Sequence, residues 1–120
     1  MISGLFLEDT PFMQVFVAWG QAVQATYAVL DTGFSGDLQV TPQMAEELGL
    51  EVIGVTEVKI ASGEVVQVPV ALAMASMERE IQTIEVLIAE SMPLMGISFL
   101  TKFSYKALVD CKHRTVTLEK

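Results

Sequence analysis

One segment of the sequence combines residue types that could carry out acid–base chemistry. Residues 28–33 read Ala-Val-Leu-Asp-Thr-Gly, so an apolar run typical of a strand ends by delivering the Asp31 carboxylate into a sharp loop. Gly33 lets backbone N–H groups approach that carboxylate because it has no Cβ. Thr32 carries a hydroxyl that can fix the loop by hydrogen bonding. The spacing indicates a site built around a carboxylate, whose chemistry would be proton transfer.

Two further segments stand out by their glycines. Leu94-Met95-Gly96 follows Asp31 by 63 residues and places two apolar residues and a glycine directly before a predicted short helix. Ser62-Gly63 is a turn dipeptide between two alternating apolar runs, which predicts a β-hairpin with its tip near Ala61–Glu64. We take the Leu94-Met95-Gly96 segment as the second element of the site.

The order of these features resembles that of the retropepsin-like aspartic proteases. That family has an Asp-Thr-Gly loop, a helix, a hairpin with small residues at its tip, and then two hydrophobic residues and a glycine before a C-terminal helix and strand. The resemblance spans residues from about Phe12 to Leu118, and it is strongest to short prokaryotic members in which Phe, here Phe34, follows the Asp-Thr-Gly. It implies an all-β fold: a closed, retropepsin-like β-barrel with two short helices.

The resemblance also implies an aspartic endopeptidase that acts as a homodimer, because each chain of that family supplies half of an active site. Two copies of Asp31 would share one proton, since two carboxylates a few ångströms apart cannot both ionise. One would activate a water molecule, and the other would donate to the scissile carbonyl oxygen of a peptide or protein substrate. The sequence contains no second Asp-Thr-Gly, so we expect a monomer to be inactive. No cofactor and no metal is implied.

The same resemblance assigns supporting roles to the other motif residues. Thr32 would hydrogen-bond across the dimer axis, and the amide of Gly33 would help to orient the carboxylates. Leu94-Met95-Gly96 would pack beneath the Asp31 loop. Ala61-Ser62-Gly63 would form the flap that closes over an extended peptide.

The chain departs from the retroviral pattern at three positions of the site. Ser35 stands where those proteins carry an Asp, and Ile97 stands where they carry an Arg that forms an ion pair with it. The absence of both charged partners is energetically consistent, because removing one partner of a buried ion pair lowers stability far more than replacing both. Phe34 stands where Ala or Ser is more common, and its ring should fill part of a substrate pocket.

A second function remains open on the same fold. A non-catalytic, dimeric peptide-binding module would keep the flap and hold extended peptides without cutting them, and Phe34 is the residue that best supports it. A purely structural dimer would leave the Asp-Thr-Gly without a purpose. A peptidase should lose all activity on Asp31→Asn, whereas a binding module should keep its affinity for peptides.

Other ligands fit the sequence less well. Residues 31–37 mimic a calcium loop, but Gly33 occupies a ligand position and Pro42 stands where the bidentate Glu should be. A strand that ends in Asp-Thr-Gly also resembles the phosphate loop of actin-like ATPases, whose two lobes need a far longer chain. Cys111 and His113 lack further partners for zinc, which prefers four ligands. We therefore predict no metal and treat both as ordinary hairpin residues.

The elements that must position the site are mostly strands. Thr41 can cap a helix that begins at Pro42, and Gly49 is its expected stop. Residues 70–90 fit both a strand and a helix, because Met74, Met77, Ile81, Ile84 and Ile88 also recur at helical spacing. We expect strands at Ile2–Glu8, Phe12–Trp19, Val23–Leu30, Leu38–Val40, Val52–Ile60, Glu64–Val70, Tyr105–Asp110 and Thr115–Leu118, and helices at Pro42–Leu48 and Ile97–Phe103.

Composition sets the outer bounds. A chain of 120 residues that is 52% hydrophobic predicts one domain over residues 1–120 with a sizeable core. Seven basic against fifteen acidic residues argue against nucleic acid as a partner. No run of about 18 apolar residues and no secretion signal is present, which predicts a cytoplasmic protein that has no membrane partner. The single Cys111 allows no internal disulfide.

Charge is unevenly distributed along the chain. Residues 101–120 hold five basic and two acidic residues, so the C-terminal end is positive while the rest is strongly negative. The two parts could pair within one chain or between two. The layout of the family that the chain resembles, together with the basic C-terminus, leads us to expect that Ile2–Glu8 and Arg114–Glu119 build the dimer interface.

Overall fold

The chain folds mostly into strands, with two short helices. The computed structural model describes residues 1–59 and 62–120. Among these residues, no helix is long and apolar enough to cross a membrane. The elements, in chain order, are β1 (Ile2–Ser3), β2 (Leu5–Leu7), β3 (Thr10–Trp19), β4 (Ala22–Leu30), β5 (Leu38–Val40), α1 (Pro42–Leu48), β6 (Val52–Lys59), β7 (Val65–Met77), β8 (Glu80–Ile88), β9 (Leu94–Met95), α2 (Ile97–Lys102), β10 (Lys106–Asp110) and β11 (Thr115–Glu119).

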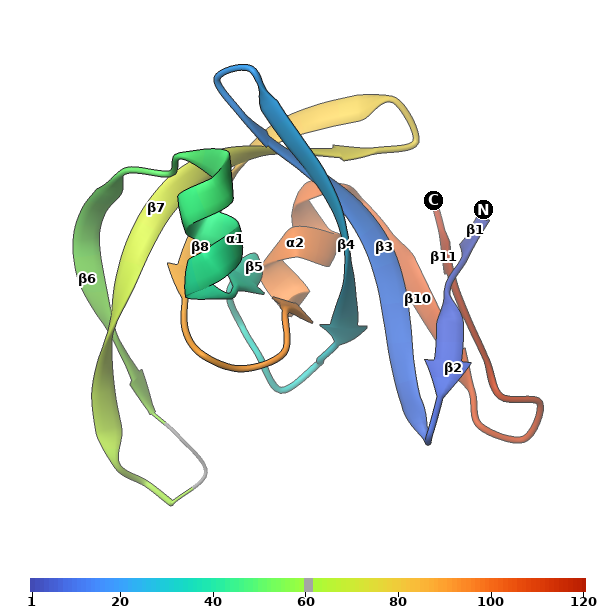
Figure 1. Ribbon diagram of the computed structural model, residues 1–120. Helices are drawn as coiled ribbons and strands as arrows, with labels where there is room; N and C mark the ends of the chain where they lie inside the picture. The colour runs from blue at the N-terminus through green and yellow to red at the C-terminus, as the bar shows by residue number, and fades with distance from the viewer. Residues whose placement is uncertain (60–61) are drawn as a thin grey trace.

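The larger of two sheets curls into a ring around the core. Its strand order is β2-β3-β4-β9-β5-β8-β7-β6, and an additional antiparallel pairing between β3 and β7 closes the strands from β3 to β7 on themselves. The curvature is visible in Figure 1, where β7 passes behind α1 and reaches β3. This ring corresponds to the closed sheet that the sequence predicts, with β2 and β6 outside it.

Alternating side chains explain why β3 and β4 form a long hairpin. Met13, Val15 and Val17 point into the core and are fully buried, while Phe16 between them is exposed. The strands turn at Gly20, whose positive φ of 58° suits a tight turn that L-residues with a Cβ rarely adopt. The break expected between the strands Phe12–Trp19 and Val23–Leu30 is therefore a tight turn.

Helix α1 begins and ends where the sequence predicts. The Thr41 side chain accepts a hydrogen bond from the backbone N–H of Met44 at 3.2 Å, and Pro42 occupies the first turn. Gly49 ends the helix in the left-handed conformation, with φ 71°. Met44, Ala45 and Leu48 bury one face of the helix against the sheet.

Residues 70–90, which fit both a strand and a helix by sequence, are two strands. Ala71, Ala73, Ala75 and Met77 are buried at every second position of β7, which is the period of a strand. Ile81, which a helical stripe would bury, is 63% exposed. The good helix formers of this segment are overridden by the pairing of β7 with β8, and of β7 with β6 and β3 on its other side.

The N-terminal segment is two strands and not the single strand expected over Ile2–Glu8. β1 pairs with β11 in the small sheet, and β2 pairs with β3 in the large one. The chain changes sheets at Gly4, where an added Cβ would lie 2.0 Å from the carbonyl oxygen of Phe12. Only glycine allows the backbone to lie this close to Phe12. In this position the backbone N–H of Gly4 donates a hydrogen bond to the Val116 carbonyl at 2.8 Å.

The small sheet is formed by both ends of the chain, in the order β1-β11-β10. Its predicted C-terminal hairpin is confirmed, because residues 111–114 turn between β10 and β11. Ile2–Ser3 pairs with Thr117–Leu118 of the same chain, so the expected contact between the two ends is satisfied without a second copy. The positive C-terminal end also pairs within the chain: Arg114 with Asp9 at 2.6 Å and Lys120 with Glu80 at 2.9 Å.

Candidate active site

Asp31 lies immediately after the last residue of β4. Its backbone N–H donates to the carbonyl of Met95 at 3.0 Å, which continues the parallel pairing of β4 with β9 by one residue. The side chain is half-buried, and its Oδ1 accepts a hydrogen bond from the backbone N–H of Gly33 at 2.9 Å. Phe34 closes the turn by donating its N–H to the Asp31 carbonyl at 3.1 Å. The loop therefore brings the amide of Gly33 to the Asp31 carboxylate.

The other loop residues face outward. Thr32, Gly33 and Ser35 are exposed in the single chain, while Phe34 is half-buried. An added Cβ on Gly33 would lie 3.2 Å from Asp31 Oδ1, tighter than nearly all such contacts. Glycine at this position thus gives the carboxylate its hydrogen bond without crowding it.

The Asp31 loop packs against Leu94, Met95 and Gly96. Met95 is fully buried, and the strand that it shares with Leu94 lies between β4 and β5. The backbone N–H of Gly96 donates to the Asp37 carbonyl at 3.0 Å. A Cβ on Gly96 would lie 2.2 Å from the Gly36 carbonyl oxygen, so no larger residue fits there without moving the loop.

Phe34 folds its ring back over the loop. An added Cβ would lie 2.7 Å from ring carbons of Phe34 if placed on either Gly36 or Gly96. The ring therefore lies against both glycines, and the Phe34 carbonyl accepts the N–H of Ile97 at 2.9 Å where α2 begins. Phe34 also lines the cavity described below, so the ring shapes that cavity and the loop at once.

Asp37 and Lys102 form an ion pair that the sequence interpretation did not anticipate. Lys102 Nζ, at the end of α2, donates to Asp37 Oδ2 at 2.6 Å, and the backbone N–H of Glu85 in β8 donates to the same oxygen at 2.9 Å. The pair joins the end of the Asp31 loop to the C-terminal helix. Ser35 and Ile97, where retroviral proteins place their ion pair, are both exposed here.

The Asp37 carboxylate is held in its charged form although it is only 4% exposed. Burial by itself would raise the pKa of Asp37, but the hydrogen bonds from Lys102 and Glu85 and the charge of Lys102 outweigh it, and the pKa lies below its ordinary value. Within the described residues, the buried Oδ1 of Asp37 has no hydrogen-bond partner. One feature of the sequence could have pointed to this ion pair: Asp37 stands alone as an acid directly before the apolar strand Leu38–Val40. A buried carboxylate needs a partner.

A cavity of about 620 Å³ adjoins the loop. One wall consists of loop residues from Gly33 to Asp37, and the opposite wall is β6, from Ile53 to Lys59. Val70, Glu85 and Leu87 complete the lining. The cavity thus combines apolar walls with the charged side chains of Glu57, Lys59 and Glu85. It lies between the Asp31 loop and the β6–β7 hairpin.

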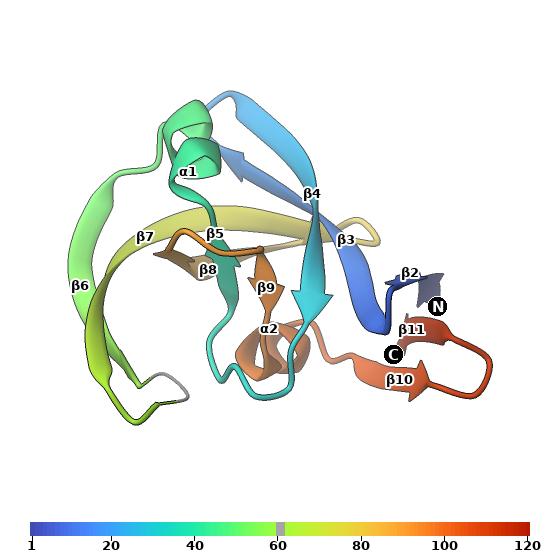
Figure 2. The same cartoon turned by 60° about the horizontal axis from the view of Figure 1, so that its bottom comes forward.

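The β6–β7 hairpin extends beyond the body of the molecule on the side of the Asp31 loop. Figures 1 and 2 both place its tip and that loop on the same side. Ser62 and Gly63 are exposed near the tip, and Gly63 has a positive φ of 89°. Ala61, the first residue of the predicted flap, and Ile60, the last residue of the predicted strand, lie outside the described residues.

One chain brings a single Asp-Thr-Gly carboxylate to this site. The other aspartates form ion pairs: Asp9 with Arg114 at 2.6 Å, Asp37 at the end of the same loop with Lys102, and Asp110 with His113 Nδ1 at 2.7 Å.

No metal site is evident in the described part of the chain. Among those residues, no three His, Cys, Asp or Glu side chains lie close enough together to hold an ion. Cys111 is exposed, and the His113 ring pairs with Asp110 at the hairpin turn.

Comparison with known proteins supports the fold. No protein-family model matches the sequence, and no curated protein matches it. Solved structures do match. A retropepsin-like aspartic protease from Rickettsia conorii aligns with a TM-score of 0.67 and 20% identity, over 98% of this chain and 87% of that one. EIAV protease, complexed with the inhibitor HBY-793, aligns with a TM-score of 0.66 and 17% identity, over 85% and 95%. The chain therefore has a retropepsin-like fold.

Proposed function

We propose that the protein is an aspartic endopeptidase that acts as a homodimer with one catalytic Asp31 from each chain. The observation that carries the proposal is the Asp31-Thr32-Gly33 loop, which presents a half-buried carboxylate at the end of β4 and fixes it through Gly33 and Met95. The loop opens beside a cavity large enough for several side chains of an extended peptide. The likeness in fold to aspartic proteases adds to this support.

The mechanism follows from pairing two such loops. Two Asp31 carboxylates brought within a few ångströms share one proton, because the second charge would be repelled by the first. The ionised member takes a proton from a water molecule, which attacks the scissile carbonyl carbon. The protonated member donates to the carbonyl oxygen, and a gem-diol forms. The protonated carboxyl then donates one proton to the leaving nitrogen, while the ionised carboxylate takes one proton from a gem-diol hydroxyl. The C–N bond breaks to give a carboxylic acid and an amine, and the pair again holds one proton and titrates as one unit.

The cavity supplies the substrate contacts. Backbone groups of β6 and of the loop can hydrogen-bond an extended chain laid between them, in the manner of an added strand. Ile53, Val55 and Phe34 offer apolar contact to side chains of that peptide. Ser62 and Gly63 would lie over the bound peptide as part of the flap, and Thr32 would hydrogen-bond to the second chain.

A dimeric peptide-binding module is the second candidate, and Phe34 favours it. The ring packs over Gly36 and Gly96, and a phenyl ring offers no hydrogen bond to a carboxylate. A binding module would use the same cavity and hairpin without turning over its ligand.

The test is cleavage of an unfolded protein mixture from pH 4 to 8, with Asp31→Asn beside the wild type. Asp9→Asn is the matched control, because it makes the same chemical change at an exposed residue outside the site. The proposal expects products from the wild type and the control, inhibition by a pepstatin-type compound, and none from Asp31→Asn. Peptide affinity that survives in Asp31→Asn, with no cleavage by any variant, would instead establish the binding module.

A further inference from the structure

Strand β8 divides its side chains between the core and the cavity beside the Asp31 loop. Ile84 and Val86 are fully buried in the core, and neither lines the cavity. Glu85 and Leu87 alternate with them along the strand, and both line the cavity. Because successive side chains of a strand point to opposite faces, the Glu85 carboxylate and the Leu87 side chain share the cavity face of β8.

The sheet holds Glu85 in a fixed place. β8 pairs with β7 on one side, where Leu72 lies opposite Glu85, and with β5 on the other. The backbone N–H of Glu85 also donates to Asp37 Oδ2 at 2.9 Å, which ties this part of β8 to the end of the Asp31 loop. The carboxylate is therefore carried by a paired strand and not by the hairpin tip. Groups on such rigid elements position a ligand more precisely than groups on loops.

The other charges that line the cavity are offset. Besides Glu85, the charged lining residues are Asp37, Glu57 and Lys59. Asp37 is paired with Lys102 at 2.6 Å. Glu57 and Lys59 carry opposite charges and lie two residues apart on the exposed side of β6. The described lining therefore has an excess of negative charge, and Glu85 carries it.

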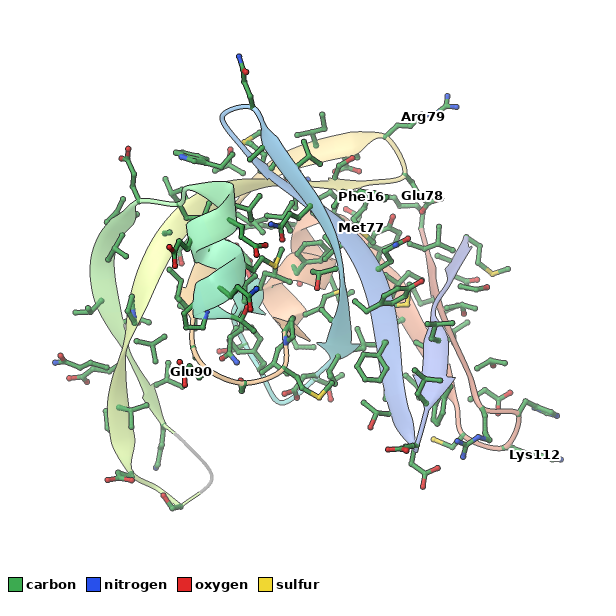
Figure 3. The ribbon with its side chains drawn as sticks, in the orientation of Figure 1. Phe16, Met77, Glu78, Arg79, Glu90 and Lys112 are labelled. Carbon is green, nitrogen blue, oxygen red and sulfur yellow. The ribbon has the colours of Figure 1, made fainter. Side chains whose placement is uncertain are left out.

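The Glu85 carboxylate lacks a counter-charge within the described residues. None of the ion pairs found there includes Glu85, and four of the basic side chains are paired with other acids: Lys102, Lys106, Arg114 and Lys120. Lys59 and Glu85 pair with positions 65 and 72 of β7, which are separated by about 23 Å of strand. Figure 3 shows Arg79 and Lys112 at turns on the other side of the molecule from the β6–β7 hairpin.

Apolar surface beside Glu85 completes a site for a long side chain with a charged end. Leu87 lies two residues further along β8, a distance of about 6.6 Å at the rise of a strand. Val70 lies opposite Leu87 on β7, and both line the cavity. Lysine and arginine carry their charge at the end of an apolar stem, so the stem can pack on Leu87 and Val70 while the charge reaches Glu85. An acidic side chain would instead be repelled by Glu85.

We propose that the cavity selects a lysine or arginine side chain of the bound peptide, and that Glu85 is the residue that sets this preference. The inference rests on the proposed function only in requiring that an extended peptide occupies the cavity, so it applies to a peptidase and to a binding module alike. Because Glu85 is exposed to water, the ion pair should give about a fivefold preference over an uncharged side chain of similar length.

A peptide scan tests the preference in the wild-type protein. Lysine, methionine or glutamate is placed at one position at a time in an otherwise uncharged peptide, and the kcat/KM of each peptide is measured by competition at one near-neutral pH. Lysine should be favoured about fivefold over methionine, and by more over glutamate, at one position on each side of the scissile bond. The neighbouring positions should show little preference, because successive side chains of an extended peptide point to opposite sides.

Variants of Glu85 test whether this residue sets the preference. Glu85→Gln keeps the size of the side chain and the backbone hydrogen bond to Asp37, and it should lower the ratio of kcat/KM between the lysine and methionine peptides to about one. Glu85→Lys should reverse the order and favour glutamate. Glu46→Gln is the matched control, because it makes the same change on the exposed side of α1, outside the lining. Its ratio should equal that of the wild type, which separates a contact at Glu85 from the general attraction of an acidic protein for basic peptides.

Binding measurements separate this proposal from the peptidase proposal. Asp31→Asn, with and without Glu85→Gln, is titrated with fluorescently labelled lysine and methionine peptides. A preference for lysine that Glu85→Gln abolishes supports the inference, even if no variant cleaves a peptide. Equal affinities and rates for lysine and methionine at every position, or a lysine preference that Glu85→Gln leaves intact, would overturn it, although cleavage that depends on Asp31 could stand. A chain that neither binds nor cleaves any of these peptides would overturn both proposals.

Discussion

The ammonium of Lys102 lies 2.6 Å from the buried carboxylate of Asp37 and thereby joins the end of the Asp31 loop to helix α2. The loop is held at its other end by the hydrogen bond from Asp31 to the Met95 carbonyl. Both anchors belong to the same stretch of chain, since α2 follows β9 directly. The position of the candidate catalytic carboxylate therefore depends on a segment more than sixty residues away in the sequence.

The two partners of this pair should not be equivalent in a stability measurement. Lys102→Met leaves a buried carboxylate without its counter-ion, and we expect it to lower the free energy of unfolding by about 3 kcal/mol. Asp37→Asn keeps an acceptor for the N–H of Glu85 and leaves a lysine that is 36% exposed and can turn into water. We expect this change to cost about 1–2 kcal/mol. Urea denaturation of both variants measures the difference.

Lys112→Met is the control for this comparison, because it removes the same charge at the exposed hairpin turn and should change stability by less than about 0.5 kcal/mol. The double variant, Asp37→Asn with Lys102→Met, should be close to Asp37→Asn alone. A strictly additive double variant would show that the ion pair does not stabilise the fold, and equal costs for the two single variants would contradict the predicted asymmetry.

Protonation of Asp37 at low pH should lower the free energy of unfolding. In the folded chain the pKa of Asp37 lies below its ordinary value of 3.8, to which it returns on unfolding. As pH falls below about 5, the unfolded state takes up the proton first, so stability is full above that range and is lost as pH falls through the folded pKa. Unfolding free energies from pH 7 to 2 should therefore fall less steeply for Asp37→Asn than for the wild type. An unchanged slope in Asp37→Asn would contradict the assignment.

Gly96 should not tolerate even alanine. The added Cβ would lie 2.2 Å from the Gly36 carbonyl oxygen and 2.6 Å from that of Phe34, and both are backbone atoms that move only with the loop. We expect Gly96→Ala to cost more than about 3 kcal/mol, or to prevent folding. Gly54→Ala is the control, since a Cβ there meets nothing within 4 Å and its backbone needs no special conformation. Thermal melts of the two variants give the comparison, and similar melting temperatures would contradict the packing described for Gly96.

Gly36 and Phe34 should be energetically coupled. The three atoms nearest to a Cβ on Gly36 all belong to the Phe34 ring, the closest at 2.7 Å. Gly36→Ala should therefore cost about 1–2 kcal/mol in the wild type, by displacing the ring, but little in a Phe34→Ala background. A double-mutant cycle by urea denaturation measures this coupling. A coupling energy near zero would mean that the ring does not rest on Gly36.

Local signals in the sequence predict a large part of this structure. Thr41, Pro42 and Gly49 define α1 to the residue, because a cap, a helix-starting proline and a left-handed stop act within a few positions of one another. The Asp31 loop is predicted for the same reason: the requirements on Thr32 and Gly33 are local. The glycine of Leu94-Met95-Gly96 marks the close approach of β9 to the loop.

Features that depend on distant partners are beyond the reach of local patterns. Residues 70–90 carry both periodicities, and only pairing of β7 with β6, β8 and β3 decides between them. The break at Gly4 depends on the approach of Phe12, which no local pattern near Gly4 reveals. Asp37 and Lys102 are 65 positions apart, so their contact appears only once the Asp31 loop and α2 are placed side by side.

A mixing experiment tests the central claim that each active site needs one Asp31 from each of two chains. Wild-type and Asp31→Asn chains are unfolded together, refolded at a fixed total concentration, and assayed for peptide cleavage as the wild-type fraction varies. If both carboxylates of a dimer are required, activity falls as the square of the wild-type fraction, so an equal mixture keeps about one quarter of the activity. A linear fall, with about one half of the activity kept in the equal mixture, would show that a single Asp31 suffices and would contradict the account.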